Sequence, residues 1–199
     1  LVGGHGRQLE QRTSQLALRS EELLRYQADI QALSLEDDDL GVGNRRAMEI
    51  VLNHLHRAAA RNHQSYSIVL IRLDDISKYR ALHGDAEADR LLQDVTQRFS
   101  SRIRRSDQLY RYTDNELLAL LPDAPLRGAL LVADRSRSEI EELLESAGLE
   151  QPDLPTLRYG FATYDGNEHE TPQEWSNIVK RAEFSLSIPV ALGEPTPPH

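Results

Sequence analysis

The chain contains no cysteine in its 199 residues. Disulfide frameworks, thiolate metal sites and cysteine nucleophiles all require a thiol, so the sequence excludes these classes of site. No apolar run approaches the roughly 20 residues that a membrane-spanning helix needs, and the first residues show no signal-peptide pattern. We expect a cytoplasmic domain, either alone or as the cytoplasmic part of a larger membrane-bound protein.

The chain also lacks an excess of basic residues. It has 23 Lys and Arg against 32 Asp and Glu, which gives a formal net charge of −9. Phosphate backbones and anionic lipids do not attract such a surface. We therefore expect neither nucleic acid nor a membrane among the partners.

The apolar sequence that is present suffices for one core. A hydrophobic content of 39% at this length predicts one globular domain with an extension. Because the sequence begins with Leu1 rather than Met, we expect an upstream sensory or membrane portion in the intact protein. Residues 1–6 are predicted to be a flexible leader, and the Pro-rich residues 194–199 a tail that cannot continue a helix.

Residues 7–36 favour one long helix, because the stretch has neither Gly nor Pro. Leu9, Leu16, Leu23 and Ile30 recur every seven residues, which is the condition for a coiled-coil seam. The other core position of the heptad repeat is occupied by polar as well as apolar residues, so the pattern predicts a weak homodimer through this helix. The alternative is a single amphipathic helix that lies on its own domain.

The remaining sequence alternates between strand and helix patterns. The central strand is predicted at residues 67–73, which form a continuous apolar run rich in β-branched residues. The order β-α-β-β-α-β predicts an α/β sandwich of the ferredoxin-like type. Helices are expected at residues 46–63, 86–105, 126–146 and 171–187, and the other strands at 108–112, 117–121 and 156–164. The cations that end the helix at 86–105 would suit the helix dipole: Arg102, Arg104 and Arg105.

Residues 104–122 (RRSDQLYRYTDNELLALLP) predict a tight β-hairpin. They resemble the signature hairpin of the GGDEF family, the diguanylate cyclases that condense two GTP into cyclic di-GMP. The family pattern is RxxD, three residues, R-Y-G-G-(D/E)-E-F, and an apolar strand closing in L-P. The chain keeps the frame at Arg104, Asp107, Arg111 and Tyr112, and replaces the motif itself by Thr113, Asp114, Asn115, Glu116 and Leu117.

The preceding segment extends this resemblance. Residues 37–46 are similar to the family's D-x-L-T-G-L-x-N-R-R, although Leu40 stands where Thr is usual. Asn44 also suits the N-cap of the helix that follows. The resemblance covers residues 37–193 and implies the ferredoxin-like palm of nucleotidyl cyclases. The matching residues are Asp37, Gly41, Asn44, Arg45 and Arg46.

The resemblance implies a degenerate catalytic site. Family members hold two divalent cations with carboxylates from the end of the central strand and from the hairpin. In the family this strand ends in the pattern D-x-D, and an ungapped alignment on Gly84 and Asp89 places Arg72 on the first aspartate and Asp74 on the second. It also places Arg80 on the asparagine that reads guanine. A shift of two residues would put Asp74 on the metal position instead.

These replacements oppose metal binding and catalysis. Of the three expected carboxylates only Glu116 remains, and a guanidinium at position 72 stays protonated at any usable pH. Side chains at Thr113 and Asp114 would keep the backbone away from phosphates. Val190 and Glu194 stand where the family has phosphate-binding Lys and Arg. We expect no metal cofactor and no cyclase activity.

Arg104 and Asp107 resemble the family's inhibitory RxxD site, which implies cyclic di-GMP as a ligand. A guanidinium can bind guanine O6/N7 or phosphate in a fork, and a carboxylate can accept from guanine N1 and N2. The alternative is a plain surface ion pair. Arg135 and Arg137 are either secondary contacts or part of a solvated helix face.

Three functional hypotheses follow. The first is a catalytically inactive signalling domain that binds cyclic di-GMP and acts on a protein partner or a fused output domain. The second is an active cyclase in which Asp74 and Glu116 hold Mg2+. The third is a dimerisation or interaction scaffold that binds no nucleotide. In the first, Arg72, Asp74, Arg80 and Asp89 form a vestigial nucleotide pocket.

Overall fold

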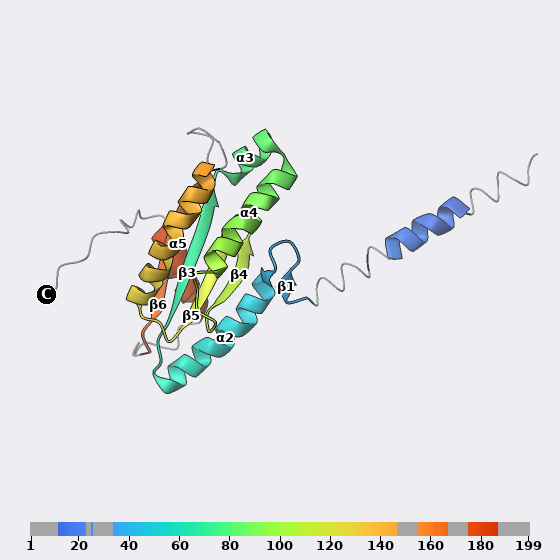
Figure 1. Ribbon diagram of the computed structural model, residues 1–199. Helices are drawn as coiled ribbons and strands as arrows, with labels where there is room; N and C mark the ends of the chain where they lie inside the picture. Colours follow the sequence, from blue (N-terminus) through green and yellow to red (C-terminus); the bar gives the residue numbers. More distant parts are fainter. Residues whose placement is uncertain (1–11, 23–24, 26–33, 147–154, 167–174, 187–199) are drawn as a thin grey trace, which may run out of the picture. The chain divides into compact units, whose positions relative to one another are not determined.

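The computed structural model describes residues 12–22, 25, 34–146, 155–166 and 175–186, and the chain divides into two units, Leu1–Leu35 and Glu36–His199 (Figure 1). In the first unit, residues 12–22 are helical, and Leu16 of the predicted seam is 65% exposed. Leu9, Leu23 and Ile30, the leader and the Pro-rich tail lie outside the described residues. The coiled coil and the homodimer therefore remain predictions.

The second unit contains one mixed sheet with helices on both faces. Its strand order is β1-β2-β4-β5-β3-β6, so the four long strands have the order β4-β5-β3-β6 of a ferredoxin-like palm, as predicted. Among the described residues, no helix is both long and apolar enough to cross a bilayer. The elements are β1 (Glu36–Asp37), β2 (Val42–Gly43), α2 (Arg45–Asn62), β3 (Tyr66–Asp74), α3 (Ile76–His83), α4 (Asp85–Ser100), β4 (Gln108–Thr113), β5 (Glu116–Pro122), α5 (Leu126–Ser146), β6 (Thr156–Tyr164) and α6 (Trp175–Leu186).

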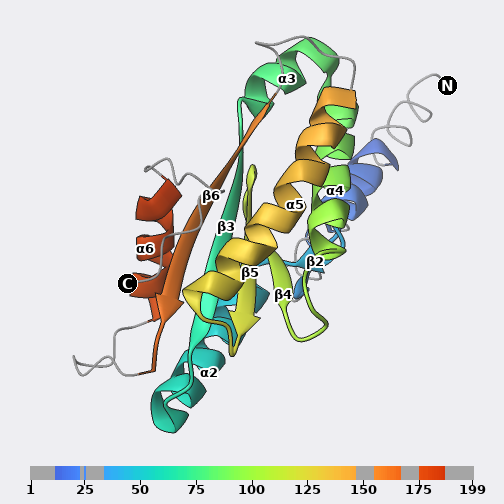
Figure 2. The same cartoon turned by 60° about the vertical axis from the view of Figure 1, so that its left-hand side comes forward.

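The central strand β3 is buried on both faces because its apolar run continues through both sets of alternating side chains. Ile68 and Leu70 belong to the core that α2 and α6 cover, whereas Val69 and Ile71 belong to the core under α4 and α5. Figure 2 shows α6 on one side of the sheet and α4 and α5 on the other. The sheet is therefore the middle of three layers.

Two local features follow directly from the sequence. The Asn44 side chain caps α2 by accepting a hydrogen bond from the Ala47 amide at 3.0 Å, as predicted. Gly160 allows α6 to lie close against β6. A Cβ at that position would stand 2.3 Å from the Ala182 carbonyl oxygen and 2.7 Å from Leu186 Cγ.

The structure corrects two expectations. The helix predicted at residues 86–105 ends at Ser100, so Arg102, Arg104 and Arg105 follow it in a loop and cannot complement its dipole. Arg102 instead forms an ion pair with Glu139 of α5. In addition, α3 forms directly after β3 and was not predicted, because its eight residues carry only a short apolar pattern. Ile76 and Tyr79 are its buried residues.

Candidate functional site

The predicted hairpin is present, with β4 and β5 joined at Asp114 and Asn115. Its turn is attached to the end of β3 through two hydrogen bonds of Asn115. The Asn115 carbonyl accepts from the Leu73 amide at 2.9 Å, and Asn115 Nδ2 donates to the Leu73 carbonyl at 3.2 Å. A carboxylate could not make the second bond, because it has no proton to donate. The asparagine therefore fastens the turn to the central strand.

Beside this turn, Arg72 forms an ion pair with Glu116. Arg72 Nε and Nη2 lie 2.6 Å and 2.5 Å from Glu116 Oε1, and the two residues are directly opposite each other in the β3–β5 register. Thr113 Oγ1 donates to the other carboxylate oxygen at 3.0 Å. The Glu116 side chain is only 7% exposed. Both of its oxygens thus have partners supplied by the chain itself.

A second ion pair extends this arrangement toward β6. Asp74 lies two residues beyond Arg72 on the same face of β3, and it pairs with Arg158 of β6. Arg158 is directly opposite Arg72 in the register of β3 and β6. Two like charges in that relation would repel, but each has its own carboxylate. The hydrogen bond to Asp74 raises the pKa of Arg158 above its usual value.

The remaining predicted pocket residues form a third group. Arg80, in the last turn of α3, binds Asp85 at 3.1 Å and Asp89 at 2.9 Å on α4. These hydrogen bonds raise the pKa of Arg80. Gly84 joins the two helices with a φ of 92°, a conformation that side chains disfavour. The structure thus brings Arg80 and Asp89 together, whereas Asp74 pairs with Arg158 rather than with Glu116.

No described set of three or more His, Asp or Glu side chains is arranged to hold a metal ion. Glu116 pairs with Arg72, Asp74 pairs with Arg158, and Asp85 and Asp89 both pair with Arg80. These carboxylates therefore lie in three separate arginine–carboxylate groups.

Arg104 and Asp107 come together in a tight turn before β4. Asp107 is 8% exposed, and its Oδ2 accepts from the Arg104 amide at 2.8 Å. The Asp107 amide donates to the Arg104 carbonyl at 3.0 Å. The Asp107 carboxylate is therefore directed into the turn, while the Arg104 side chain is exposed.

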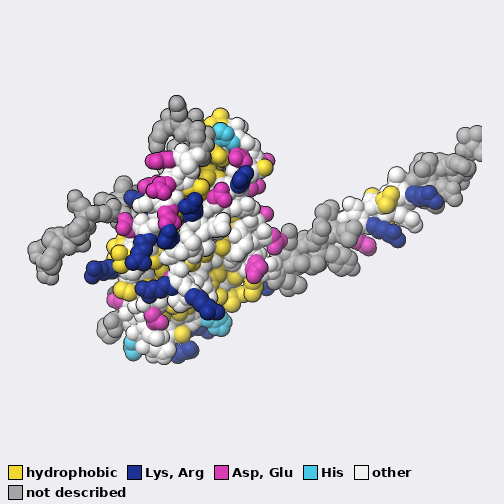
Figure 3. Space-filling model, in the orientation of Figure 1, with side chains coloured by type: hydrophobic (Ala, Val, Ile, Leu, Met, Phe, Trp, Pro, Cys, Tyr) yellow, Lys and Arg dark blue, Asp and Glu magenta, His cyan; other side chains and the backbone are white. Residues whose placement is uncertain are grey.

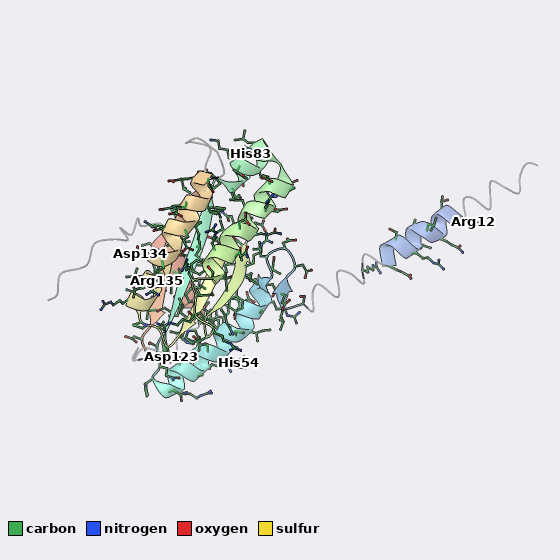
Figure 4. All side chains as sticks on the ribbon, viewed as in Figure 1. Arg12, His54, His83, Asp123, Asp134 and Arg135 are labelled. Carbon is green, nitrogen blue, oxygen red and sulfur yellow. The ribbon has the colours of Figure 1, made fainter. Side chains whose placement is uncertain are left out.

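The two further arginines differ in their surroundings. Arg137 extends its guanidinium over the Tyr159 ring at 5.5 Å and lies 3.9 Å from Glu141, so it takes part in packing α5 against β6. Arg135 is exposed beside Asp134 on the outside of α5 (Figure 4). Lys and Arg side chains are frequent over this face of the domain (Figure 3).

Sequence reasoning missed the contacts that join the start of the domain to the hairpin. Arg111 Nη1 lies 3.2 Å from carboxylate oxygens of both Asp37 and Asp39. These residues border an open hollow of about 450 Å3. Asp37 and Arg111 each match the family pattern, but no spacing rule links residues so far apart in sequence.

A second missed group surrounds Tyr112 on the other face of β4. The Arg45 guanidinium lies 4.6 Å above its ring, and its hydroxyl donates to Glu183 Oε1 of α6 at 2.6 Å. Burial, followed by this hydrogen bond, raises the pKa of Tyr112 to about 12. The group holds α2 and α6 to the hairpin.

Comparison with known proteins gives one family. The family described as "Diguanylate cyclase, GGDEF domain" matches residues 36–186. The diguanylate cyclase DosC of Escherichia coli K12 is 25% identical over 145 residues, which are 73% of this chain and 30% of DosC. The chain thus spans about a third of the length of this curated relative.

Solved structures show the same fold. Diguanylate cyclase SiaD of Pseudomonas aeruginosa, solved with its activator SiaC, superposes with a TM-score of 0.66 at 23% identity, covering 92% of this chain and 69% of SiaD. The coiled coil and GGDEF domain of DgcB from Caulobacter crescentus, solved with cyclic di-GMP, also gives 0.66, at 16% identity, covering 90% of this chain and 92% of that structure.

Proposed function

The chain belongs to the diguanylate cyclase GGDEF domain family of cyclic di-GMP signalling, and we propose that it is a catalytically inactive member of that family. The observation that carries this proposal is the ion pair between Arg72 and Glu116. The one carboxylate retained by the hairpin motif is neutralised by the residue that replaces a metal-binding aspartate.

Divalent cations do not fit this group of residues. Mg2+ needs several oxygen ligands around one point, and the catalytic chemistry of the family requires two such ions. Here a cation next to Glu116 would have to displace a guanidinium whose Nη2 is 2.5 Å from the carboxylate. Asp74 could contribute only after losing Arg158. Each step would leave a permanent positive charge beside the incoming ion.

Nucleotide binding meets similar obstacles. Arg80 stands where the family reads guanine with an amide, and it already bridges Asp85 and Asp89. At the turn, Asn115 bonds to the β3 backbone and Asp114 is exposed with its negative charge. A triphosphate would approach a like charge there, without a metal to screen it.

We place the regulatory ligand at Arg104. Its exposed guanidinium can meet guanine O6/N7 or a phosphate oxygen of cyclic di-GMP in a fork. The sequence predicted that the Asp107 carboxylate would accept hydrogen bonds from guanine. In this proposal it has another role, because it accepts from the Arg104 amide and closes the turn that presents Arg104. Binding to this turn would leave the vestigial pocket untouched.

The same proposal includes a cytoplasmic location, a weak homodimer through residues 7–36, and an output carried by a protein partner or a fused domain. The DgcB structure pairs a coiled coil with a GGDEF domain. SiaD was solved with a protein activator. Both support, by similarity, a domain of this kind that works through its neighbours.

Incubation of the whole chain with GTP and Mg2+ or Mn2+, followed by chromatography for cyclic di-GMP, tests the inactive assignment. We expect no product. Product formation would support the cyclase hypothesis, with Asp74 and Glu116 as metal ligands, and would overturn ours.

Calorimetric titration with cyclic di-GMP tests the Arg104 site. We expect saturable binding that Arg104→Ala weakens by about tenfold or more, in keeping with the loss of a forked contact. Arg61→Ala, at an exposed arginine in the last turn of α2, should bind normally. Absence of binding to the unaltered chain would favour the nucleotide-free scaffold.

A further inference from the structure

The outer edge of β6 is a second surface of interest. β6 is the last strand of the sheet, and among the described residues no other strand pairs with its outer side. Figure 2 shows it between α5 on one face of the sheet and α6 on the other. An edge of this length offers backbone groups to any extended chain that reaches it.

The hydrogen bonding of β3 identifies the β6 residues whose backbone N–H and C=O groups point away from β3. These are called the outward residues, whatever the direction of their side chains. The Leu73 amide donates to Asn115 on the β5 side, so the odd-numbered residues of β3 direct their backbone groups toward β5. The even-numbered residues of β3 therefore bond to β6, where they pair with even-numbered residues such as Gly160 and Ala162. The outward residues of β6 are Leu157, Tyr159, Phe161 and Thr163.

An apolar hollow of about 470 Å3 lies along this edge. Leu126 and Phe161 line it on the α5 side, and Phe184 lines it on the α6 side. Phe184 is 70% exposed, and Leu126 is also exposed. Side chains of an added strand alternate between the two faces, so they would meet these groups in turn.

The hollow is also positively charged. Lys180 and Arg181 border it, in a chain whose net charge is −9. Arg181 Nη2 donates to the outward Thr163 carbonyl at 2.9 Å, so a flexible side chain occupies one of the strand positions. An incoming backbone amide could replace that bond, and an acidic side chain could approach the Arg181 guanidinium.

We propose that the β6 edge binds an extended segment of a partner protein in which apolar and acidic residues alternate. The main chain of this segment adds a strand to the sheet. Its apolar residues face Leu126 on the α5 side, and its acidic residues face Lys180 and Arg181 on the α6 side. A second copy of this chain fits less well, because its β6 sequence, TLRYGFATY, has no acidic side chain to pair with Lys180 and Arg181.

Hydrogen exchange of the whole chain, followed residue by residue by NMR, tests whether the edge is open. The outward amides of Tyr159, Phe161 and Thr163 should exchange about 100-fold or more faster than the inward amides of Gly160 and Ala162. Equal protection that does not change with protein concentration would mean that the chain covers its own edge. Protection that rises with concentration would mean that a second copy does. Either result overturns the proposal.

Binding of a defined probe tests the chemistry of the occupant. A blocked heptapeptide of alternating Glu and Leu should bind saturably and slow the exchange of the outward β6 amides. The same sequence with N-methylated backbone amides, or with Lys in place of Glu, should bind at least about tenfold more weakly. No binding of the Glu-Leu peptide, or equal binding of all three peptides, refutes the proposal.

Variants locate the binding surface. Leu126→Ser and Lys180→Glu should each weaken the binding of the probe by about tenfold while leaving the melting temperature unchanged, because both side chains are exposed. Lys78→Glu, on α3 and outside the hollow, is the matched charge control. Unaltered affinity in the Leu126 and Lys180 variants would place the peptide elsewhere and overturn the assignment.

Discussion

Replacing Arg72 by aspartate should convert the arginine–carboxylate contact into a divalent cation site. The new carboxylate would face Glu116 across β3 and β5 and would share a face of β3 with Asp74. Without metal, the variant loses the attraction between Arg72 and Glu116 and gains a repulsion between two carboxylates at the same point. With metal, the same carboxylates become ligands.

The size of the effect follows from the ion-pair geometry. Two unit charges about 4 Å apart interact by about 4 kcal/mol at an effective dielectric constant near 20. The Arg72 side chain is 31% exposed, so solvent screens part of this energy. We expect the metal-free variant to be less stable by about 2 to 4 kcal/mol, which lowers the melting temperature by about 5 to 15 °C for a domain of this size.

Thermal melts in EDTA and in Mn2+ measure both parts of the prediction. At a Mn2+ concentration about 100-fold above the dissociation constant, binding should return about 2.7 kcal/mol to Arg72→Asp. The unaltered chain should not respond. Arg72→Gln separates charge loss from ligand gain, because it should be destabilised in EDTA and remain so in Mn2+.

Two results would refute this reasoning. If Mn2+ stabilises the unaltered chain as much as the variant, Arg72 does not exclude cations and the cyclase hypothesis gains support. If Arg72→Asp melts at the original temperature in EDTA, the ion pair contributes nothing to folding.

Three further predictions concern the fold around the site. Gly160→Ala should lower the free energy of unfolding by about 3 kcal/mol in urea melts, since its Cβ would lie 2.3 Å from a backbone oxygen of α6; unchanged stability would contradict that packing. Asn44→Ala should cost about 1 kcal/mol through loss of the α2 cap, with Asn44→Asp as a capping control. Tyr112→Phe should cost about 1 kcal/mol at pH 7. Because the folded pKa of Tyr112 is about 12 against 10.0 unfolded, its contribution falls as pH rises through that window, and the variant should lose less stability there; parallel pH curves would contradict this.

The palm fold could be predicted from the sequence because strong local patterns specify its central strands. The β-branched run of β3 and the hairpin around Asp114 predicted the central strands, and the strand predicted at residues 156–164 has the bounds of β6. Helix α3 was missed because one short amphipathic segment gives little periodicity to read. The end of α4 was misplaced because the run of arginines after Ser100 suits a helix end as well as a loop.

The site was predicted only in part, for a different reason. Alignment to a family pattern identified Arg72 and Arg80 as replacements and Asp74 and Asp89 as matches, but it could not say what these side chains contact. Arg158 carried no signal at all, because its role depends on lying opposite Arg72 in an adjacent strand distant in sequence. Cross-strand partners are set by register, which a single sequence does not show.

These contacts also explain how the hairpin can keep its position without a ligand. Glu116 on β5 is fixed to Arg72, and the turn is fixed to Leu73 through Asn115. At the other strand, Arg111 on β4 is fixed to Asp37 at the start of the domain. A metal ion would bind Glu116 and leave it again in each catalytic cycle. The Arg72 guanidinium, in contrast, is part of the same sheet and is always present. In the inactive domain that we propose, Arg72 thus keeps the hairpin in permanent order in place of binding a catalytic metal ion, which would suit a domain that transmits a signal rather than one that turns over a substrate.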